Sequence, residues 1–247
     1  MNSLANKIQR WVALRTLRNP LALKGGSGVV SFSFDDAPES ACTAGKVILE
    51  KHGCQGTWYV AGGLTGQYEQ GRVCHSIPSL QNLVRDGHHI GCHTYSHTPC
   101  NQLSRHAMVQ ELERNARFLD EVGVPAEGRH FSFPLGAFDV ASKRLASYQF
   151  QSCRITGGGI QVGVADLNAL RSERLYQHVI TPARLKALVD EVALKKGWLI
   201  FYTHAVDNPP GLWGCTPQLL DYAVEAALEA GCKVLPVDQA VHYWRTR

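Results

Sequence analysis

The sequence predicts an α/β protein, and more narrowly a (β/α) barrel of seven or eight mostly parallel strands. Apolar, β-branched runs alternate with helix-like segments along the whole chain, at intervals of about 25–40 residues. The 247 residues suffice for seven or eight such units in one domain. A doubly wound open sheet is the alternative, although the chain lacks both G-x-x-x-x-G-K-[ST] and a G-x-G-x-x-G after its first strand.

Strands are expected where short apolar runs lie between turn-forming residues. The clearest is 29–35, which follows a glycine-rich turn and ends in two adjacent carboxylates, Asp35 and Asp36. The other predicted strands are 55–60, 88–92, 130–133, 152–155, 176–180, 198–202 and 233–237.

Helices are expected between these strands, at 40–52, 78–85, 104–122, 139–148, 181–196 and 216–230, with a short one at the C-terminus. Pro78, Pro182 and Pro217 suit a first helical turn because proline has no N–H to lose there. Asp139 can accept hydrogen bonds as an N-cap. Gly123 is expected to end the helix at 104–122.

The composition is that of an ordinary globular protein, with 45% hydrophobic and 19% charged residues. The formal charge of +4 comes without a dense basic patch in the sequence, which argues against nucleic acid as a partner. Eight cysteines are scattered without a C-x-x-C pair, so they are expected to be buried thiols of a reducing compartment.

Residues 1–24 form a basic, helical N-terminal segment, and residues 25–247 a single domain. The segment has no acidic residue and no continuous apolar region of the kind that a signal peptide requires, so a cytoplasmic location is expected. The favoured interpretation is a short helix that covers one end of the barrel. Because Leu4, Ile8 and Trp11 share a helical face, the alternative is a weak peripheral contact with an anionic membrane.

Six polar residues lie at or just past the C-terminal ends of predicted strands, the edge that holds the site in parallel α/β folds. An isolated Asp-Asp pair more often caps a turn and faces solvent, but the histidines downstream favour a functional role. His93 and His97 would share one face of a helical turn, where both can bind one metal ion. The six residues are Asp35, Asp36, His93, His97, Ser132 and His204.

Two histidines and one carboxylate suit a divalent cation, most of all Zn²⁺, with Co²⁺ or Mn²⁺ as alternatives. Such a set leaves positions for water and substrate. Thr94 stands where the zincin motif H-E-x-x-H has its glutamate, so a general base must come from elsewhere. Asp35 and Asp36 can supply the third ligand and that base.

These motifs resemble those of the polysaccharide deacetylases, the NodB-homology carbohydrate esterases. The first family motif, [TS]-F-D-D-G, matches residues 33–36, with Ala37 in place of glycine. The second, H-[ST]-x-x-H, matches residues 93–97 in full. The last, an apolar strand that ends in histidine, matches residues 199–204.

The resemblance implies a distorted (β/α) barrel and assigns roles within the site. Asp36, His93 and His97 would bind the metal. Asp35 would be the catalytic base, and His204 would protonate the leaving amine. We further expect the backbone N–H of Leu135 to help hold the oxyanion of the reaction.

The third motif departs from the family pattern, which is R-x-P-Y-G or close to it. Residues 131–136 keep its proline and glycine but place Ser132 where the arginine should be. In the family that arginine orients the catalytic aspartate, so a substitute is needed. Arg171, near the expected place of a fourth motif, is a candidate, and its alternative is a surface ion pair. Tyr59 and Trp213 are candidates for the sugar site, although core packing is favoured for both.

The sequence therefore predicts a metal-dependent amide hydrolase that removes an acyl group, with acetyl as the first choice, from an N-acylated amino sugar. In the cytoplasm the substrate would be an intermediate of cell-surface polysaccharide synthesis, carried on a nucleotide or a lipid. The alternatives are a carbohydrate-binding relative with weak or no activity, and a hydrolase of a small non-sugar amide. The sequence gives no indication of an oligomeric state.

Overall fold

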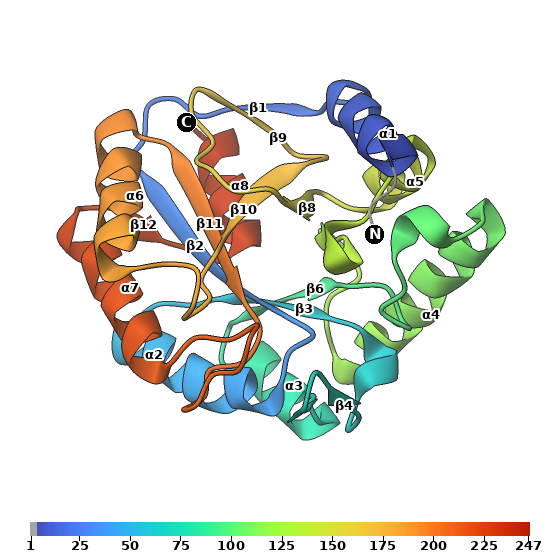
Figure 1. Ribbon diagram of the computed structural model, residues 1–247, viewed down its shortest axis with the longest axis horizontal. Coiled ribbons are helices and arrows are strands. Elements are labelled where there is room, and N and C mark those ends of the chain that lie inside the picture. The colour runs from blue at the N-terminus through green and yellow to red at the C-terminus, as the bar shows by residue number, and fades with distance from the viewer. Residues whose placement is uncertain (1–3) are drawn as a thin grey trace.

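The computed structural model describes residues 4–247, with side chains from residue 7 onward. Within that range seven parallel strands close into a barrel (Figure 1), which confirms the predicted fold class. β11 pairs with β2 and completes the ring. In order around the barrel, which is also chain order, the strands are β2 (Val29–Asp35), β3 (Thr57–Val60), β6 (His89–Cys92), β7 (Phe131–Ser132), β8 (Cys153–Thr156), β10 (Leu170–Arg174) and β11 (Trp198–Thr203).

The barrel is distorted around β2. On one side β2 pairs with β11 from Val29 to Phe34. On the other side only its second half pairs with β3, and its first two residues pair instead with β12 (Lys233–Val234). All seven residues of β2 are buried, although polar residues alternate with apolar ones from Val30 to Asp35.

Helices cover the outside of the barrel (Figure 1). Side-chain caps fix where most of them begin. The helices α3, α4, α5, α6 and α7 each follow a residue whose side chain accepts a hydrogen bond from a backbone N–H of the first turn. Asp139 forms a capping box with Ser142, as its position suggested. The helices are α1 (Leu4–Arg15), α2 (Lys46–Lys51), α3 (Ile77–Arg85), α4 (Arg105–Val122), α5 (Val140–Gln149), α6 (Pro182–Lys195), α7 (Pro217–Glu229) and α8 (Val237–Arg245).

Two short antiparallel pairs lie outside the barrel. β4 (Tyr68–Glu69) and β5 (Arg72–Val73) form a hairpin after β3. β1 (Pro20–Ala22) pairs with β9 (Val164–Asp166).

Aromatic side chains fill much of the space between the barrel and its helices. Phe34 of β2 stacks on Trp58 of β3 with ring centroids 4.6 Å apart, and both side chains are fully buried. Burying a large apolar side chain contributes about 1.5–3 kcal/mol. Each of the eight cysteines is a buried free thiol, as predicted.

One predicted strand is wrong. The sixth barrel strand is β10 rather than 176–180, which forms a turn before α6. Three of the five residues of β10 are charged, and only alternate residues face the interior. The apolar residues that suggested a strand, Tyr176 and Ile180, are buried as parts of the turn.

The N-terminal helix α1 packs against α5 at the edge of the barrel (Figure 1). Ile8 and Trp11 are 54% and 56% exposed, and the Arg15 guanidinium stacks 3.8 Å above the Trp11 ring. The first three residues of the predicted segment, and the side chain of Leu4, lie outside the described part. Within residues 4–247 no helix is both long and apolar enough to cross a membrane.

Candidate metal centre and active site

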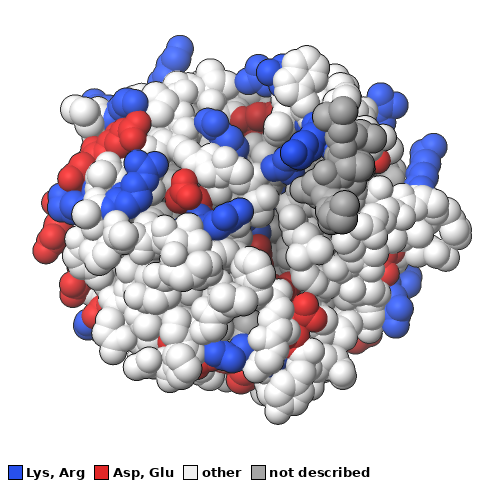
Figure 2. Space-filling view, in the orientation of Figure 1, with Lys and Arg blue, Asp and Glu red and all other residues white. Residues whose placement is uncertain are grey.

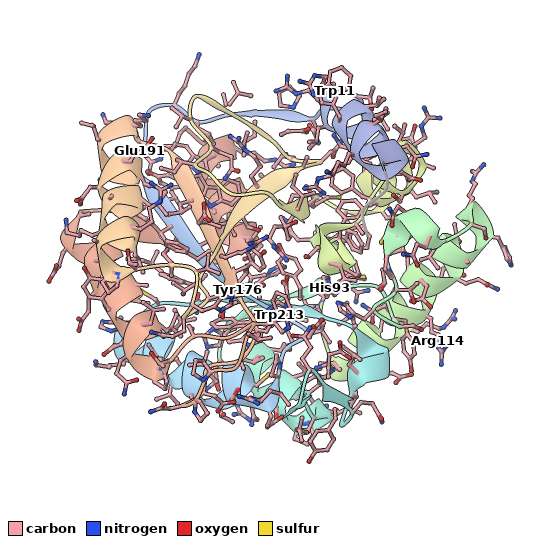
Figure 3. All side chains as sticks on the ribbon, viewed as in Figure 1. Trp11, His93, Arg114, Tyr176, Glu191 and Trp213 are labelled. Carbon is pink, nitrogen blue, oxygen red and sulfur yellow. The ribbon has the colours of Figure 1, made fainter. Side chains whose placement is uncertain are left out.

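The predicted site residues meet at the C-terminal ends of the barrel strands, around a cavity of about 210 Å³. Figure 3 shows His93, Tyr176 and Trp213 close together at the middle of the view, and all three line this cavity. Asp35, His97 and His204 line it too. Asp36 lies just beneath, with its side chain 1% exposed.

Asp36, His93 and His97 have the spacing of a metal site. The Oδ1 atom of Asp36 lies 3.1 Å from His97 Nε2 and 3.6 Å from His93 Nε2. Atoms bound at about 2.0–2.1 Å from a tetrahedral Zn²⁺ are roughly 3.3 Å apart. Both carboxylate oxygens of Asp36 are buried and accept no hydrogen bond from the described residues. Buried polar atoms rarely stay without a partner, so the three residues fit a divalent cation.

Both histidines are in the protonation state that a metal ligand requires, whereas the Asp36 carboxyl must lose a proton to bind. Burial lowers the pKa of His93 to about 3 and lowers that of His97, so both imidazoles are neutral near neutral pH. Burial raises the pKa of the Asp36 carboxyl to about 7, and the neighbouring Asp35 adds to the rise. His93 Nδ1 donates to the carbonyl oxygen of Ser132 at 2.7 Å, which leaves Nε2 free to bind.

The histidine pair is held by a loop, not by the helical turn that the spacing suggested. Residues 93–97 form a bend after β6 in which Thr94 and His97 adopt the left-handed φ values 59° and 54°. Glu111 of α4 fixes this loop, because its carboxylate accepts from the N–H groups of Tyr95 and Ser96 at 3.0 and 2.7 Å. Strained backbone of this kind tends to gather at functional sites.

The turn after β2 is left-handed as well. Asp36 has a φ of 60° and Ala37 a φ of 48°. A residue without a Cβ adopts this conformation most easily, which accounts for the glycine that the family motif has at the place of Ala37. The turn directs the two neighbouring carboxylates differently, so that Asp36 faces the histidines while Asp35 faces the barrel interior.

Asp35 is buried and paired with Arg154 of β8. The Nη2 group of Arg154 donates to both Asp35 oxygens, to Oδ1 at 2.6 Å, and to Ser132 Oγ. Its Nη1 group donates to Ser172 Oγ at 2.6 Å. Burial alone would raise the pKa of Asp35, but the charge of Arg154, aided by nearby histidines, outweighs burial and lowers it. Asp35 is therefore ionised and can accept a proton.

Arg171, the candidate for orienting Asp35, does not take that role. Arg171 is exposed, and its Nη2 donates to the carbonyl oxygen of Ile160 at 3.1 Å. Arg154 takes the place instead. Arg154 lies in the middle of a predicted buried strand. A charge in such a place needs a partner, and this is the feature of the sequence that points to Arg154.

His204 follows β11 on the other side of Asp36. Its Nε2 lies 3.6 Å from Asp36 Oδ2, and its Nδ1 lies 3.3 Å from the hydroxyl of Tyr176. Tyr176 was not predicted as a site residue because residues 176–180 resembled a strand. Trp213 is 45% exposed and lines the cavity rather than the core, whereas Tyr59 is buried as expected.

Leu135 is 65% exposed at the rim of the cavity, with a left-handed φ of 56°. Its N–H has no acceptor among the described residues. The geometry is that of a free backbone donor beside the candidate metal ligands, as an oxyanion site requires.

Comparison with known proteins identifies the family to which this chain is similar. The family model for polysaccharide deacetylase matches residues 23–151, just over half of the chain. A chitin deacetylase of Arthroderma benhamiae is 25% identical over 129 residues, which is 50% of this chain and 32% of that protein. A chitin deacetylase of Colletotrichum lindemuthianum is 28% identical over 96 residues, 38% of each chain. The matched part of this chain thus spans only 32% and 38% of the two curated relatives.

The fold is that of solved deacetylases as well. The structure of the chitin deacetylase from Colletotrichum lindemuthianum superposes with a TM-score of 0.62 at 14% identity, over 89% of this chain and 88% of that one. Both barrel and motifs thus agree with the family match, and the chain belongs to the polysaccharide deacetylase family.

Proposed function

We propose that this protein is a metal-dependent hydrolase that removes an acetyl group from an N-acetylated amino sugar. The observation that carries the proposal is the arrangement of three candidate ligands beside an ionised Asp35 and beside His204, which lies outside the ligand set; the ligands are Asp36, His93 and His97. A divalent ion held by the three ligands would supply Lewis-acid activation of water and of the amide carbonyl.

Asp35 takes the proton that the attacking water loses. Its carboxylate is ionised and directed by Arg154, and it lines the cavity where the amide would lie. The N–H of Leu135 donates to the oxyanion of the tetrahedral intermediate. Since this N–H comes from the backbone, the oxyanion donor does not depend on which side chain residue 135 carries.

His204 donates a proton to the leaving nitrogen. An amine leaves poorly as an anion, and His204 stands on the far side of Asp36 from the metal-ligating histidines. The hydroxyl of Tyr176 near Nδ1 orients the imidazole. Asp35 and His204 thus act on opposite sides of the amide, one as base and one as acid.

The alternative of a carbohydrate-binding relative without activity is less well supported. Its main argument was the missing arginine at Ser132, and Arg154 supplies a guanidinium to the same carboxylate. We propose further that the substrate is an intermediate of cell-surface polysaccharide synthesis. The protein would act on it in the cytoplasm, with weak membrane contact through α1.

The experiment is an acetate-release assay on chitooligosaccharides, N-acetylglucosamine and UDP-N-acetylglucosamine, with added Zn²⁺, Co²⁺ or Mn²⁺. Acetate should be released from at least one substrate by the wild type and not by Asp35→Asn. If the two proteins release equal amounts, or neither releases any with any metal, the proposed function is wrong.

A further inference from the structure

A second cavity, of about 290 Å³, adjoins the active-site cavity. The two share part of their lining, namely Leu135, Gly136, Thr156 and Arg174. A molecule whose amide lies at the candidate metal centre can therefore extend into the second cavity. We call it the basic cavity, and its lining is Lys7, Arg10, Asn101, Leu135, Gly136, Ala137, Phe138, Thr156 and Arg174.

Three cations and no carboxylate line the basic cavity. Lys7 and Arg10 come from α1, and Arg174 comes from the end of β10. The chain has no acidic residue before Asp35, so the helix that brings two of the cations brings no counter-charge. Glu173 is next to Arg174 in sequence, but its carboxylate accepts from the backbone N–H of Gly159 at 3.1 Å and does not line the cavity.

Arg10 is fixed between the two cavities. Its guanidinium donates to the carbonyl oxygens of Gly136 and Thr156, two of the shared lining residues, and lies 4.6 Å above the Phe138 ring. Carbonyl oxygens fix the position of a guanidinium without neutralising its charge. This cation is thus held in place at the passage from one cavity to the other.

Arg174 has donors that are free to bind a ligand in the basic cavity. The Nε of Arg174 donates to the Tyr202 hydroxyl at 3.3 Å, which leaves its Nη groups without a partner among the described residues. Figure 2 shows Lys and Arg side chains gathered near α1, beside the hollow in the middle of this face.

We infer that the basic cavity binds a phosphoryl group of the substrate, so that the amino sugar is presented as a phosphate or diphosphate ester. The inference rests on the proposed function and names its substrate class. Three cations exceed the charge of one carboxylate but match a phosphate or diphosphate, and the arginine fork fits phosphate oxygens. A neutral chitin chain would leave these charges without a partner.

The first test is the binding of inorganic pyrophosphate to the full-length protein, measured by titration calorimetry. The variant Lys7→Gln/Arg174→Gln removes the two exposed cations and should bind at least about tenfold more weakly than wild type, since a hydrogen bond to a charged group contributes that much. The control is Arg171→Gln, an exposed arginine on the same strand that does not line the cavity, and it should bind as wild type. Pyrophosphate held by a metal ion alone would bind wild type and the double variant equally, and that result would overturn the inference.

The second test compares substrates. Wild type should have a higher kcat/KM for UDP-N-acetylglucosamine than for N-acetylglucosamine, and Lys7→Gln/Arg174→Gln should lose most of this preference. A preference for N-acetylmuramic acid, whose charge is a carboxylate, over both phosphorylated and neutral sugars would contradict a phosphoryl site. A further measurement compares the binding of wild type to UDP with its binding to phosphatidylcholine vesicles that contain polyprenyl phosphate. Stronger binding to UDP would assign the phosphoryl group to a nucleotide, and stronger binding to the vesicles would assign it to a lipid.

The two tests separate the inference from the proposed function. Charge-dependent pyrophosphate binding without acetate release from any substrate would support the cavity and reject the deacetylase. Acetate release from chitooligosaccharides, with pyrophosphate binding that the double variant leaves unchanged, would support the deacetylase and reject the phosphoryl site.

Discussion

The Arg154 guanidinium donates hydrogen bonds to both carboxylate oxygens of Asp35, from 119 positions away in the sequence. It also donates to Ser132, its register partner on the neighbouring strand β7. The small side chain of Ser132 leaves room for this contact. The arginine of the family's third motif would reach the same carboxylate from β7, so in this chain the guanidinium comes from one strand further along the barrel.

We expect Arg154→Gln to impair both stability and catalysis. A buried carboxylate left without its partner costs about 3–5 kcal/mol in the free energy of unfolding. Because Arg154 lowers the pKa of Asp35, its loss raises that pKa, and the acid limb of the kcat/KM profile should move to higher pH. The control, Arg171→Gln, should keep the wild-type profile. Denaturant unfolding and pH-dependent kinetics check the two effects.

The exchange Ser132→Arg/Arg154→Ser tests the positioning role directly. It returns the arginine to the place that the family motif gives it, on the register partner of residue 154. The exchanged protein should have a higher kcat/KM than Arg154→Gln and an acid limb closer to wild type. An Arg154→Gln protein with the stability and the pH profile of wild type would contradict the role of Arg154.

Metal content should depend on both histidines. We expect His93→Ala and His97→Ala to lose most of the bound metal, because each removes one of three candidate ligands. His106→Ala, an exposed histidine on α4, is the matched control and should keep it. Elemental analysis of the purified proteins is the measurement, and unchanged stoichiometry in the ligand variants would disprove the site.

Metal affinity should fall in mild acid because of Asp36 rather than the histidines. Asp36 has a pKa raised to about 7 in the metal-free protein, so below that pH a metal ion must displace the proton of this carboxyl. His93, with a pKa of about 3, is already neutral. The affinity should drop by about tenfold per pH unit below 7, as expected for one released proton. Competition with a chelator at several pH values measures this slope. Asp36→Asn should bind more weakly and without the slope, and a flat wild-type profile would refute the assignment.

The sequence predicted those parts of the site that local patterns encode. The largely apolar runs at 29–35 and 198–202 are strands, and the residues at or just past their ends, Asp35 and His204, lie at the site. It could not predict what depends on the register of neighbouring strands. Arg154 reaches Asp35 only because β7 and β8 align Ser132 with Arg154 inside a closed barrel. β10 was missed because three of its five residues are charged, which makes this strand resemble a loop in the sequence.

Tyr176→Phe should slow the reaction moderately. The Tyr176 hydroxyl lies 3.3 Å from His204 Nδ1, and burial raises the pKa of this tyrosine, so it remains a neutral hydrogen-bond partner. Loss of one such bond costs about 0.5–1.5 kcal/mol, which lowers kcat roughly two- to tenfold. Metal content should not change. A wild-type kcat in Tyr176→Phe would mean that the hydroxyl does not orient His204.

The final prediction concerns the division of labour between Asp35 and His204. Both line the cavity, and neither belongs to the candidate ligand set. We expect Asp35→Asn and His204→Ala each to lower kcat on an N-acetylated sugar by about 10²–10⁴, the usual contribution of a general base or acid. Metal content should stay near wild type in both variants.

A substrate whose leaving group needs no proton separates the two roles. With 4-nitrophenyl acetate, the phenolate leaves without protonation, so His204→Ala should retain much of the wild-type rate while Asp35→Asn should not. The basic limb of the kcat profile on the amide, which reports the general acid, should disappear or shift in His204→Ala alone. Full activity of His204→Ala on the amide would show that another group donates the proton. Loss of metal in Asp35→Asn would show that Asp35 rather than Asp36 is the ligand.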